Sequence, residues 1–257
     1  MQRDPQVDLI FSHFIPRYEA TGVDPNDLRA LMPRVTQWQD WCRLWSEEGA
    51  RHETLGEEAK AKSYRRTAAE SFVRAAMYYH YGKHLFADRA EEFQRAHEAM
   101  LRCYSAGAAH LDPPIERVEF PYRGVAMPGW LRKPRGVARP PVAIILPGLD
   151  ACKEELHAWA EEVFRVRSHS KTIEECHERG KALTLEGRAE NIRCPLLVIF
   201  GAGDRLIAPA EGERLAREAS GKSELVVYPE GNHVCFNISY KFRPLSGDWM
   251  AKTLGHA

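Results

Sequence analysis

The chain has 257 residues, of which 44% are hydrophobic and 28% are charged, as in globular proteins with one large domain or two small ones. Its 36 basic and 36 acidic residues give a formal net charge of zero, which argues against a nucleic-acid partner. No stretch approaches the ~18 consecutive apolar residues of a membrane span, so we expect no membrane association.

The N-terminal stretch, MQRDPQVDLIFSHFIPRYEA, contains no apolar core of the length that a signal peptide requires. Six cysteines occur along the chain without a CxxC pair, a usage typical of reduced thiols rather than of a disulfide framework. We therefore expect a cytoplasmic protein.

Three tryptophans predict the first long helix, because Trp38, Trp41 and Trp45 recur at helical spacing and share one face. Thr36 and Gln39 have the spacing of a capping box, in which each side chain bonds to a free backbone amide of the first turn. This pair predicts that the helix begins near residue 36.

Two further helices are predicted before residue 112. Thr54 and Glu57 repeat the capping-box spacing and predict the start of the second helix, and Asp88 is a candidate cap for the third. The expected buried positions are Phe72, Ala76 and Tyr79 on the second helix, and Phe93, Met100 and Leu101 on the third. These side chains either form the core or line a substrate pocket, and the core is the simpler interpretation.

The pattern changes at Asp112-Pro113-Pro114, where the prolines end the helix. Alternation of apolar residues from 118 to 122 predicts a half-buried strand, which turns at Arg123-Gly124 and returns over 126–134. The run VAIIL, residues 142–146, predicts a strand buried on both faces, followed by a helix over 151–164. We therefore predict a helical region over 1–114 and an α/β region over 115–257.

The C-terminal part predicts two more strands, 196–200 and 225–228, with a helix from Pro209 between them and a last helix over 242–254. Asp204 follows the first strand and His233 follows the second. Because ligands bind at the carboxyl ends of strands in open α/β sheets, we expect these two side chains to meet there.

An aspartate and a histidine in this arrangement can perform acid–base chemistry. A neutral imidazole accepts a proton from a nucleophile and returns it to a leaving group, and a carboxylate on its other nitrogen fixes the tautomer. The chain order, acid before histidine, is that of the Ser…Asp…His triads of α/β-hydrolases. Asp204 and His233 are therefore the candidate catalytic residues, although either alone could be a turn or loop residue.

Three stretches, LPGLDACKEE, IRCPLLVIFGAGDRLIAP and YPEGNHVCFNISYKFRPLSGDW, resemble the 2,6-dihydroxypseudooxynicotine hydrolase group of α/β-hydrolases. The resemblance implies an α/β-hydrolase fold preceded by a helical region. It also implies hydrolysis of a carbon–carbon bond next to a ketone, or of an ester, in a small substrate, without a metal or organic cofactor. Asp204 would be the acid, His233 the base, and Gly148-Leu149 would give a backbone donor to the oxyanion hole. A homodimer through the helical region is a further expectation.

The nucleophile that this resemblance implies is missing. The Gly-x-Ser-x-Gly elbow does not occur; the nearest sequence, CYSAG at 103–107, lies in a predicted helix, and RSHSKT at 167–172 lacks the glycines. In RSHSKT, Thr172 with Glu175 instead predicts a helix cap.

The resemblance breaks between Phe164 and Arg165, where about three strand–helix units, roughly 90 residues, are absent. Three explanations remain open: a deletion in the gene, a segment omitted from the recorded sequence, or a remnant that persists as a ligand-binding or protein-binding module. The chain as written is expected to be inactive.

Overall fold

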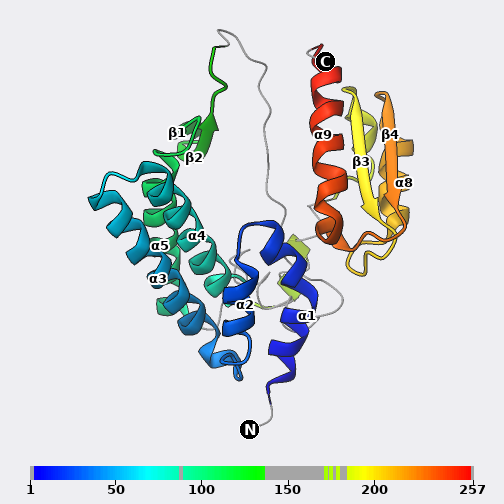
Figure 1. Ribbon diagram of the computed structural model, residues 1–257. Coiled ribbons are helices and arrows are strands. Elements are labelled where there is room, and N and C mark those ends of the chain that lie inside the picture. The colour runs from blue at the N-terminus through cyan, green and yellow to red at the C-terminus, as the bar shows by residue number, and fades with distance from the viewer. Residues whose placement is uncertain are drawn as a thin grey trace. The chain divides into compact units, whose positions relative to one another are not determined.

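A computed structural model describes residues 3–86, 89–136 and 184–255, together with the pairs 171–172, 174–175 and 178–179. The chain divides into two compact units, Met1–Leu146 and Pro147–Ala257 (Figure 1). The boundary that we expect after residue 114 stays a prediction. The predicted strand 142–146, the predicted helix 151–164 and the junction at 164/165 lie outside the described residues.

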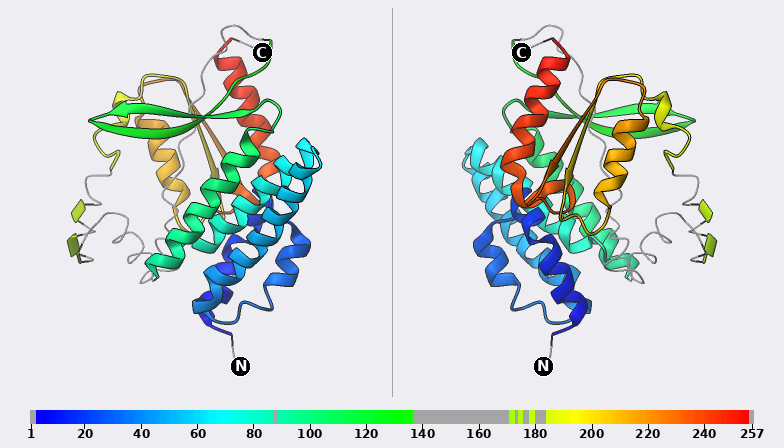
Figure 2. Two further views of the ribbon diagram at one scale, coloured as in Figure 1. Left: turned by 90° about the vertical axis from the view of Figure 1, so that its left-hand side faces the viewer. Right: turned by 90° about the vertical axis from the view of Figure 1, so that its right-hand side faces the viewer.

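The first unit consists mainly of helices. Their bounds are α1 Pro5–Ala20, α2 Pro25–Leu31, the 3-10 helix η1 Trp38–Asp40, α3 Trp41–Ala61, α4 Arg65–Lys83 and α5 Ala90–Ala108. Asp4 and Asp24 cap α1 and α2, and in both helices a proline follows at the first position. The three long helices α3, α4 and α5 lie side by side in both views of Figure 2 and form the frame of this unit.

One of the predicted helix starts is wrong, and another is right without the predicted cap. Thr54 lies inside α3, where its hydroxyl donates to the carbonyl of Ala50 at 3.0 Å, so the helix continues through it. Near Thr36 the helical segment does begin, with η1 at Trp38 and α3 directly after it at Trp41, but the residue that precedes η1 is Gln37 and no side chain caps it. Asp88, the third predicted cap, lies outside the described residues. A threonine can therefore satisfy its hydroxyl within a helix as well as at its start.

The core of the helical unit is aromatic. The ring of Trp45 is fully buried, and its centroid lies 5.1 Å from that of Tyr18 and 5.6 Å from that of Trp41. Helices α3 and α4 approach closely at Gly56, where a Cβ atom would lie only 2.8 Å from the ring of Phe72. The absence of a side chain at this position permits the contact. The predicted stripe on α4 and all three tryptophans of the predicted face are buried. These side chains are therefore mainly core.

The predicted buried face of α5 is wrong. Leu101 is 42% exposed, and Phe93 and Met100 are only half-buried. The buried residues of α5 are Ala96, Ala99, Cys103, Gly107 and Ala108. A Cβ atom on Gly107 would lie 2.8 Å from the side chain of Val73 in α4. Small residues thus bring α5 against α4, and the larger apolar side chains lie at the edges of the contact.

A polar network joins α2, α3 and α4. Asp27 Oδ2 lies 2.7 Å from His52 Nε2 and accepts a hydrogen bond from the hydroxyl of Tyr78, also at 2.7 Å. Arg51 donates to Oδ1 of the same carboxylate. Burial raises the pKa of Asp27, but the hydrogen bonds from Tyr78, His52 and Arg51 outweigh this, so its pKa is lowered overall. The network therefore stabilises the ionised carboxylate.

We expect Tyr78→Phe to reduce the free energy of unfolding by about 1.5–3 kcal/mol at neutral pH, because a largely buried carboxylate loses a donor. A group whose folded-state pKa is lowered contributes stability above its unfolded pKa, about 4 for a carboxylate, and loses it as pH falls further. The difference between variant and wild type should therefore shrink below about pH 4. Urea unfolding at several pH values measures this. Tyr104→Phe is the control, because no hydrogen bond of its hydroxyl occurs among the described residues; an equal loss there would contradict the prediction.

Strands β1, Ile115–Tyr122, and β2, Val125–Arg132, form the predicted antiparallel hairpin. Arg123 and Gly124 make its turn with φ values of 47° and 79°, the left-handed conformation of a two-residue hairpin turn. The expected half-burial is wrong for Phe120 and Tyr122, which are 59% and 55% exposed. Phe120 pairs with Met127, so an apolar face of the hairpin is open to solvent.

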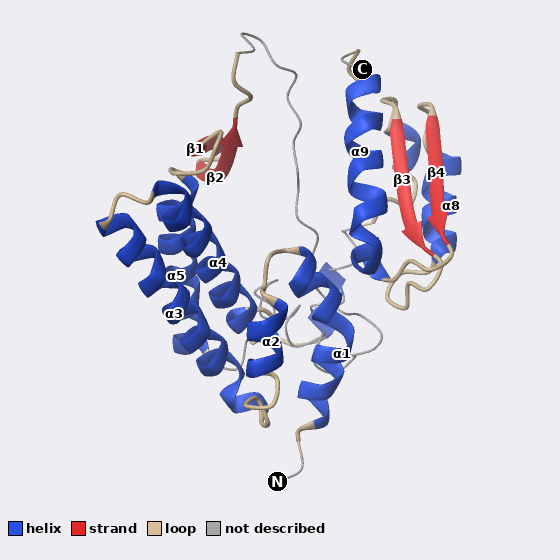
Figure 3. Cartoon of the chain, viewed as in Figure 1, coloured by secondary structure: helices blue, strands red, loops and turns tan. Residues whose placement is uncertain are grey.

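The second unit holds a parallel strand pair, drawn red in Figure 3. Its elements are η2 Ala189–Asn191, β3 Leu196–Gly201, α8 Pro209–Glu218, β4 Ser223–Tyr228, η3 His233–Ile238 and α9 Ser239–Thr253. Both strands, the connecting helix from Pro209 and the final helix are present as predicted, except that β4 begins at Ser223 rather than at 225 and α9 at Ser239 rather than at 242. Within the described ranges, none of the helices is long and apolar enough to cross a bilayer.

Candidate active site

The candidate site lies where β3 and β4 end. The strands pair in register from Leu196 opposite Ser223 to Gly201 opposite Tyr228. The pairing continues past the strand ends, because Ala202 N donates to the carbonyl of Tyr228 at 2.8 Å. The loop after β3 and the loop after β4 therefore leave the sheet together, and each carries one of the predicted catalytic residues.

The Asp204 side chain is held firmly. Its Oδ1 accepts hydrogen bonds from the backbone amides of Leu206 at 2.8 Å and Ile207 at 3.0 Å. The side chain is only 3% exposed, so these amides replace the water that a carboxylate needs. Sequence reasoning missed the two amides, although an aspartate followed by a short loop is the usual setting for such bonds.

His233 meets this carboxylate through Nδ1, which lies 2.9 Å from Asp204 Oδ2 and 3.1 Å from Oδ1. The predicted contact between the two side chains is thus present. The carboxylate favours the tautomer with the proton on Nδ1 and leaves Nε2 as the acceptor nitrogen. The His233 side chain is 24% exposed, so the imidazole remains accessible. The arrangement can take up a proton at Nε2, and whether it does so in catalysis stays a prediction.

The remaining parts of the predicted site are not brought to this pair. Gly148 and Leu149 lie outside the described residues. Among the residues that the structure describes, no serine, threonine or cysteine side chain is hydrogen-bonded to His233. Burial raises the pKa of Cys235, and the nearby carboxylates of Asp204 and Glu230 raise it further, so this thiol is not an activated nucleophile.

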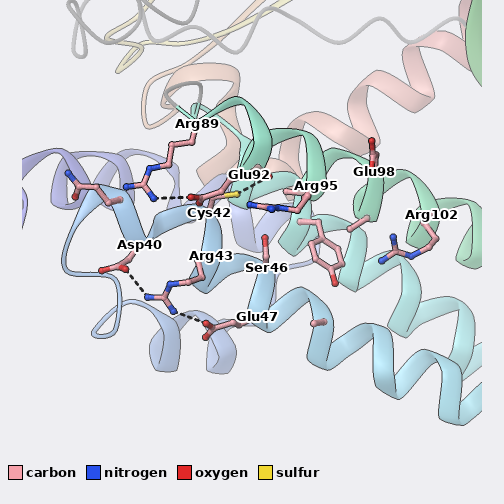
Figure 4. Close-up of a pocket in the computed structure, with 15 residues that line it drawn as sticks. Asp40, Cys42, Arg43, Ser46, Glu47, Arg89, Glu92, Arg95, Glu98 and Arg102 are labelled. Carbon is pink, nitrogen blue, oxygen red and sulfur yellow. Dashed lines mark hydrogen bonds and ion pairs between the residues drawn. The ribbon is translucent and has the colours of Figure 1, made fainter.

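A separate groove of about 800 Å³ lies in the helical unit between α3 and α5 (Figure 4). Its cations are largely neutralised, since Arg43 pairs with Asp40 and Glu47. The Cys42 thiol faces this groove, and burial raises its pKa to about 11, so it stays protonated at neutral pH. Tyr79, one of the predicted pocket aromatics, lines the groove while only 6% exposed. The groove therefore offers a mixed polar surface without a reactive group.

Comparison with known proteins decides the family. Residues 34–173, more than half of the chain, match the family described as Esterase FrsA-like. The chain belongs to the FrsA-like esterases. The matched segment of the chain covers most of the helical unit and ends before β3, so it includes neither Asp204 nor His233. The roles of those two residues rest on their geometry and chain order.

Two relatives of the chain are hydrolases by name. The alpha/beta hydrolase gkaG of Penicillium citrinum is 30% identical over 157 residues, which are 58% of this chain and 37% of that protein. The 2,6-dihydropseudooxynicotine hydrolase of Paenarthrobacter nicotinovorans is 31% identical over 134 residues, or 52% of this chain and 36% of that protein. The matches thus span little more than a third of these relatives' own length.

A solved structure shows the fold of the chain. The crystal structure of the 2,6-dihydroxy-pseudo-oxynicotine hydrolase superposes with a TM-score of 0.79, at 20% identity, over 93% of this chain and 95% of that chain. The fold is that of an α/β-hydrolase with a helical N-terminal region. Of its sheet, the described residues show the parallel pair β3–β4, beside the separate hairpin β1–β2.

Proposed function

We propose that Asp204 and His233 are the acid and base of a serine-type hydrolase. The observation that carries this proposal is the distance of 2.9 Å between Asp204 Oδ2 and His233 Nδ1 at the ends of adjacent parallel strands. The chain order, acid before histidine, also fits an α/β-hydrolase triad. The substrate would be a small aromatic or polyketide-like ketone or ester, a proposal that rests on the relatives named as hydrolases of 2,6-dihydropseudooxynicotine and of 20-hydroxy-prefusarin.

In the complete site, a serine hydroxyl would attack the substrate carbonyl while His233 Nε2 takes its proton. The imidazolium that forms would be stabilised by Asp204. A backbone amide of the Gly148-Leu149 loop would hold the oxyanion, and His233 would then return the proton to the leaving carbon or oxygen. No residue of this scheme requires a metal or an organic cofactor.

We also propose a cytoplasmic location and a homodimer through the helical unit.

A second candidate function is a binding module without catalysis. It is favoured by one observation, the absence of a Gly-x-Ser-x-Gly sequence from the chain. Such a remnant would bind a small ligand or a protein partner and leave it unchanged.

The transcript across the codons of Phe164 and Arg165 separates these candidates. If it encodes an elbow serine, we expect its product to hydrolyse activated esters. We then expect Asp204→Asn to lower kcat by about 10⁴-fold and His233→Ala by about 10⁶-fold. Variants that keep more than a tenth of the activity would argue against the acid–base roles. A continuous junction, with no elbow serine in the transcript, would favour the binding module.

A further inference from the structure

The backbone around His233 has an unusual conformation. The two residues after it, Val234 and Cys235, have φ values of 57° and 55°. This left-handed region is strongly disfavoured for a β-branched residue such as Val234. A strained conformation of this kind persists only where the surrounding structure enforces it. Some contact must therefore hold the backbone that follows β4 in this conformation.

Asn237 makes the bonds that close this loop. Its Oδ1 accepts from the backbone amide of Asn232 at 3.0 Å, and its Nδ2 donates to the backbone carbonyl of Glu230 at 2.8 Å. Its own amide donates to Oδ1 of Asn232 at 3.4 Å. The three bonds enclose His233 on both sides in the sequence. All of them stay within residues 230–237, so they join η3 to the turn that precedes it rather than to another helix or strand.

The closed loop is in turn fixed against the loop that carries Asp204. Gly203 N donates to the carbonyl of Gly231 at 2.9 Å. A Cβ atom on Gly201 would lie 2.3 Å from that same carbonyl oxygen, so only glycine permits this approach. The position of the Asp204 loop is thus coupled to the position of residues 230–232, the end of the loop that Asn237 holds.

We infer that Asn237 is a positioning residue for His233, which holds the imidazole so that Nδ1 faces Asp204. The inference rests on the proposed pairing of Asp204 and His233 as acid and base. Asn237 is exposed, and it bonds to the segment that carries the imidazole rather than to the imidazole itself. Its loss should therefore alter the Asp204–His233 contact more than it alters the stability of the fold.

The test is nuclear magnetic resonance of the full chain with labelled histidine, in which His233→Gln identifies the signal of His233 among eleven histidines. In wild type we expect the Nδ1-protonated tautomer and a slowly exchanging Nδ1 proton. Asn237→Ala should mix the tautomers and make exchange of that proton at least about tenfold faster. Asn237→Asp keeps the acceptor for Asn232 N and should recover part of the protection.

The matched control is Asn191→Ala, whose side chain makes no hydrogen bond among the described residues of its unit and should leave the His233 signal unchanged. Circular dichroism and urea unfolding of every variant report the fold. An unchanged His233 signal in a folded Asn237→Ala protein would overturn the inference about Asn237. The proposed roles of Asp204 and His233 would not be affected by that result. If wild type lacks the Nδ1-protonated tautomer, the pair itself fails, and with it both the proposed function and the inference. Loss of the His233 signal that accompanies global unfolding, without recovery in Asn237→Asp, would also count against positioning.

Discussion

Purified chain should remain unlabelled by a fluorophosphonate probe and should not turn over an activated ester. The Asp204–His233 pair can move a proton, but the described structure brings no hydroxyl or thiol to the imidazole, and the chain contains no elbow serine. Loss of the nucleophile from a complete triad costs about 10⁶-fold in kcat. The chain should therefore lie at least that far below a complete serine hydrolase.

The control for this result is His233→Ala, which should be indistinguishable from wild type, since both lack the attacking atom. A complete serine hydrolase assayed in parallel shows that probe and ester are competent. Labelling of one serine at a ratio near one per chain, together with turnover that His233→Ala abolishes, would contradict the prediction and identify a nucleophile outside the described residues.

Trp45→Ala should be strongly destabilising to the helical unit. The side chain is fully buried, and its ring contacts aromatic residues of α1, α3 and α4. Replacing a buried tryptophan by alanine leaves a cavity and typically costs about 3–5 kcal/mol. This is a large fraction of the ~5–15 kcal/mol by which a domain is stable, so much of the unit should unfold at moderate urea concentrations.

Leu55→Ala on the same helix is the comparison, because Leu55 is 44% exposed and its truncation should cost less than about 1 kcal/mol. Urea unfolding followed by helical circular dichroism measures both variants. Equal midpoints for the two would mean that the aromatic cluster around Trp45 is not the centre of the core.

The sequence predicts the second unit better than the first, for a physical reason. Strands β3 and β4 are continuous apolar runs ended by glycine or proline, and Pro209 marks the helix between them, so pattern and structure agree. The catalytic candidates follow the strand ends directly, which is why their contact could be predicted. The loop chemistry that holds them could not, because the bonds of Asn237 depend on the path of the backbone.

Short sequence motifs do not settle where the helices of the helical unit begin or which of their residues are buried. The spacing of Thr54 and Glu57 equals that of Thr172 and Glu175, yet only the second pair shows the capping bond, from Glu175 N to Thr172 Oγ1 at 3.2 Å. Leu101 looks like a core residue by hydrophobicity, but close helix contact selects the smaller Ala99. Such outcomes depend on the distance between helices, which the spacing of residues along one helix does not contain.

The β3–α8–β4 segment explains why Asp204 and His233 meet without help from the rest of the chain. Asp204 and His233 are 29 positions apart, and the strands that bring them together are consecutive in the chain. Closing a loop of this length costs less chain entropy than closing a longer one. The contact between the two side chains therefore depends on this β–α–β segment and not on a nucleophile elsewhere in the chain. Contact between an aspartate and a histidine is therefore evidence of this local fold and not, by itself, of catalytic activity.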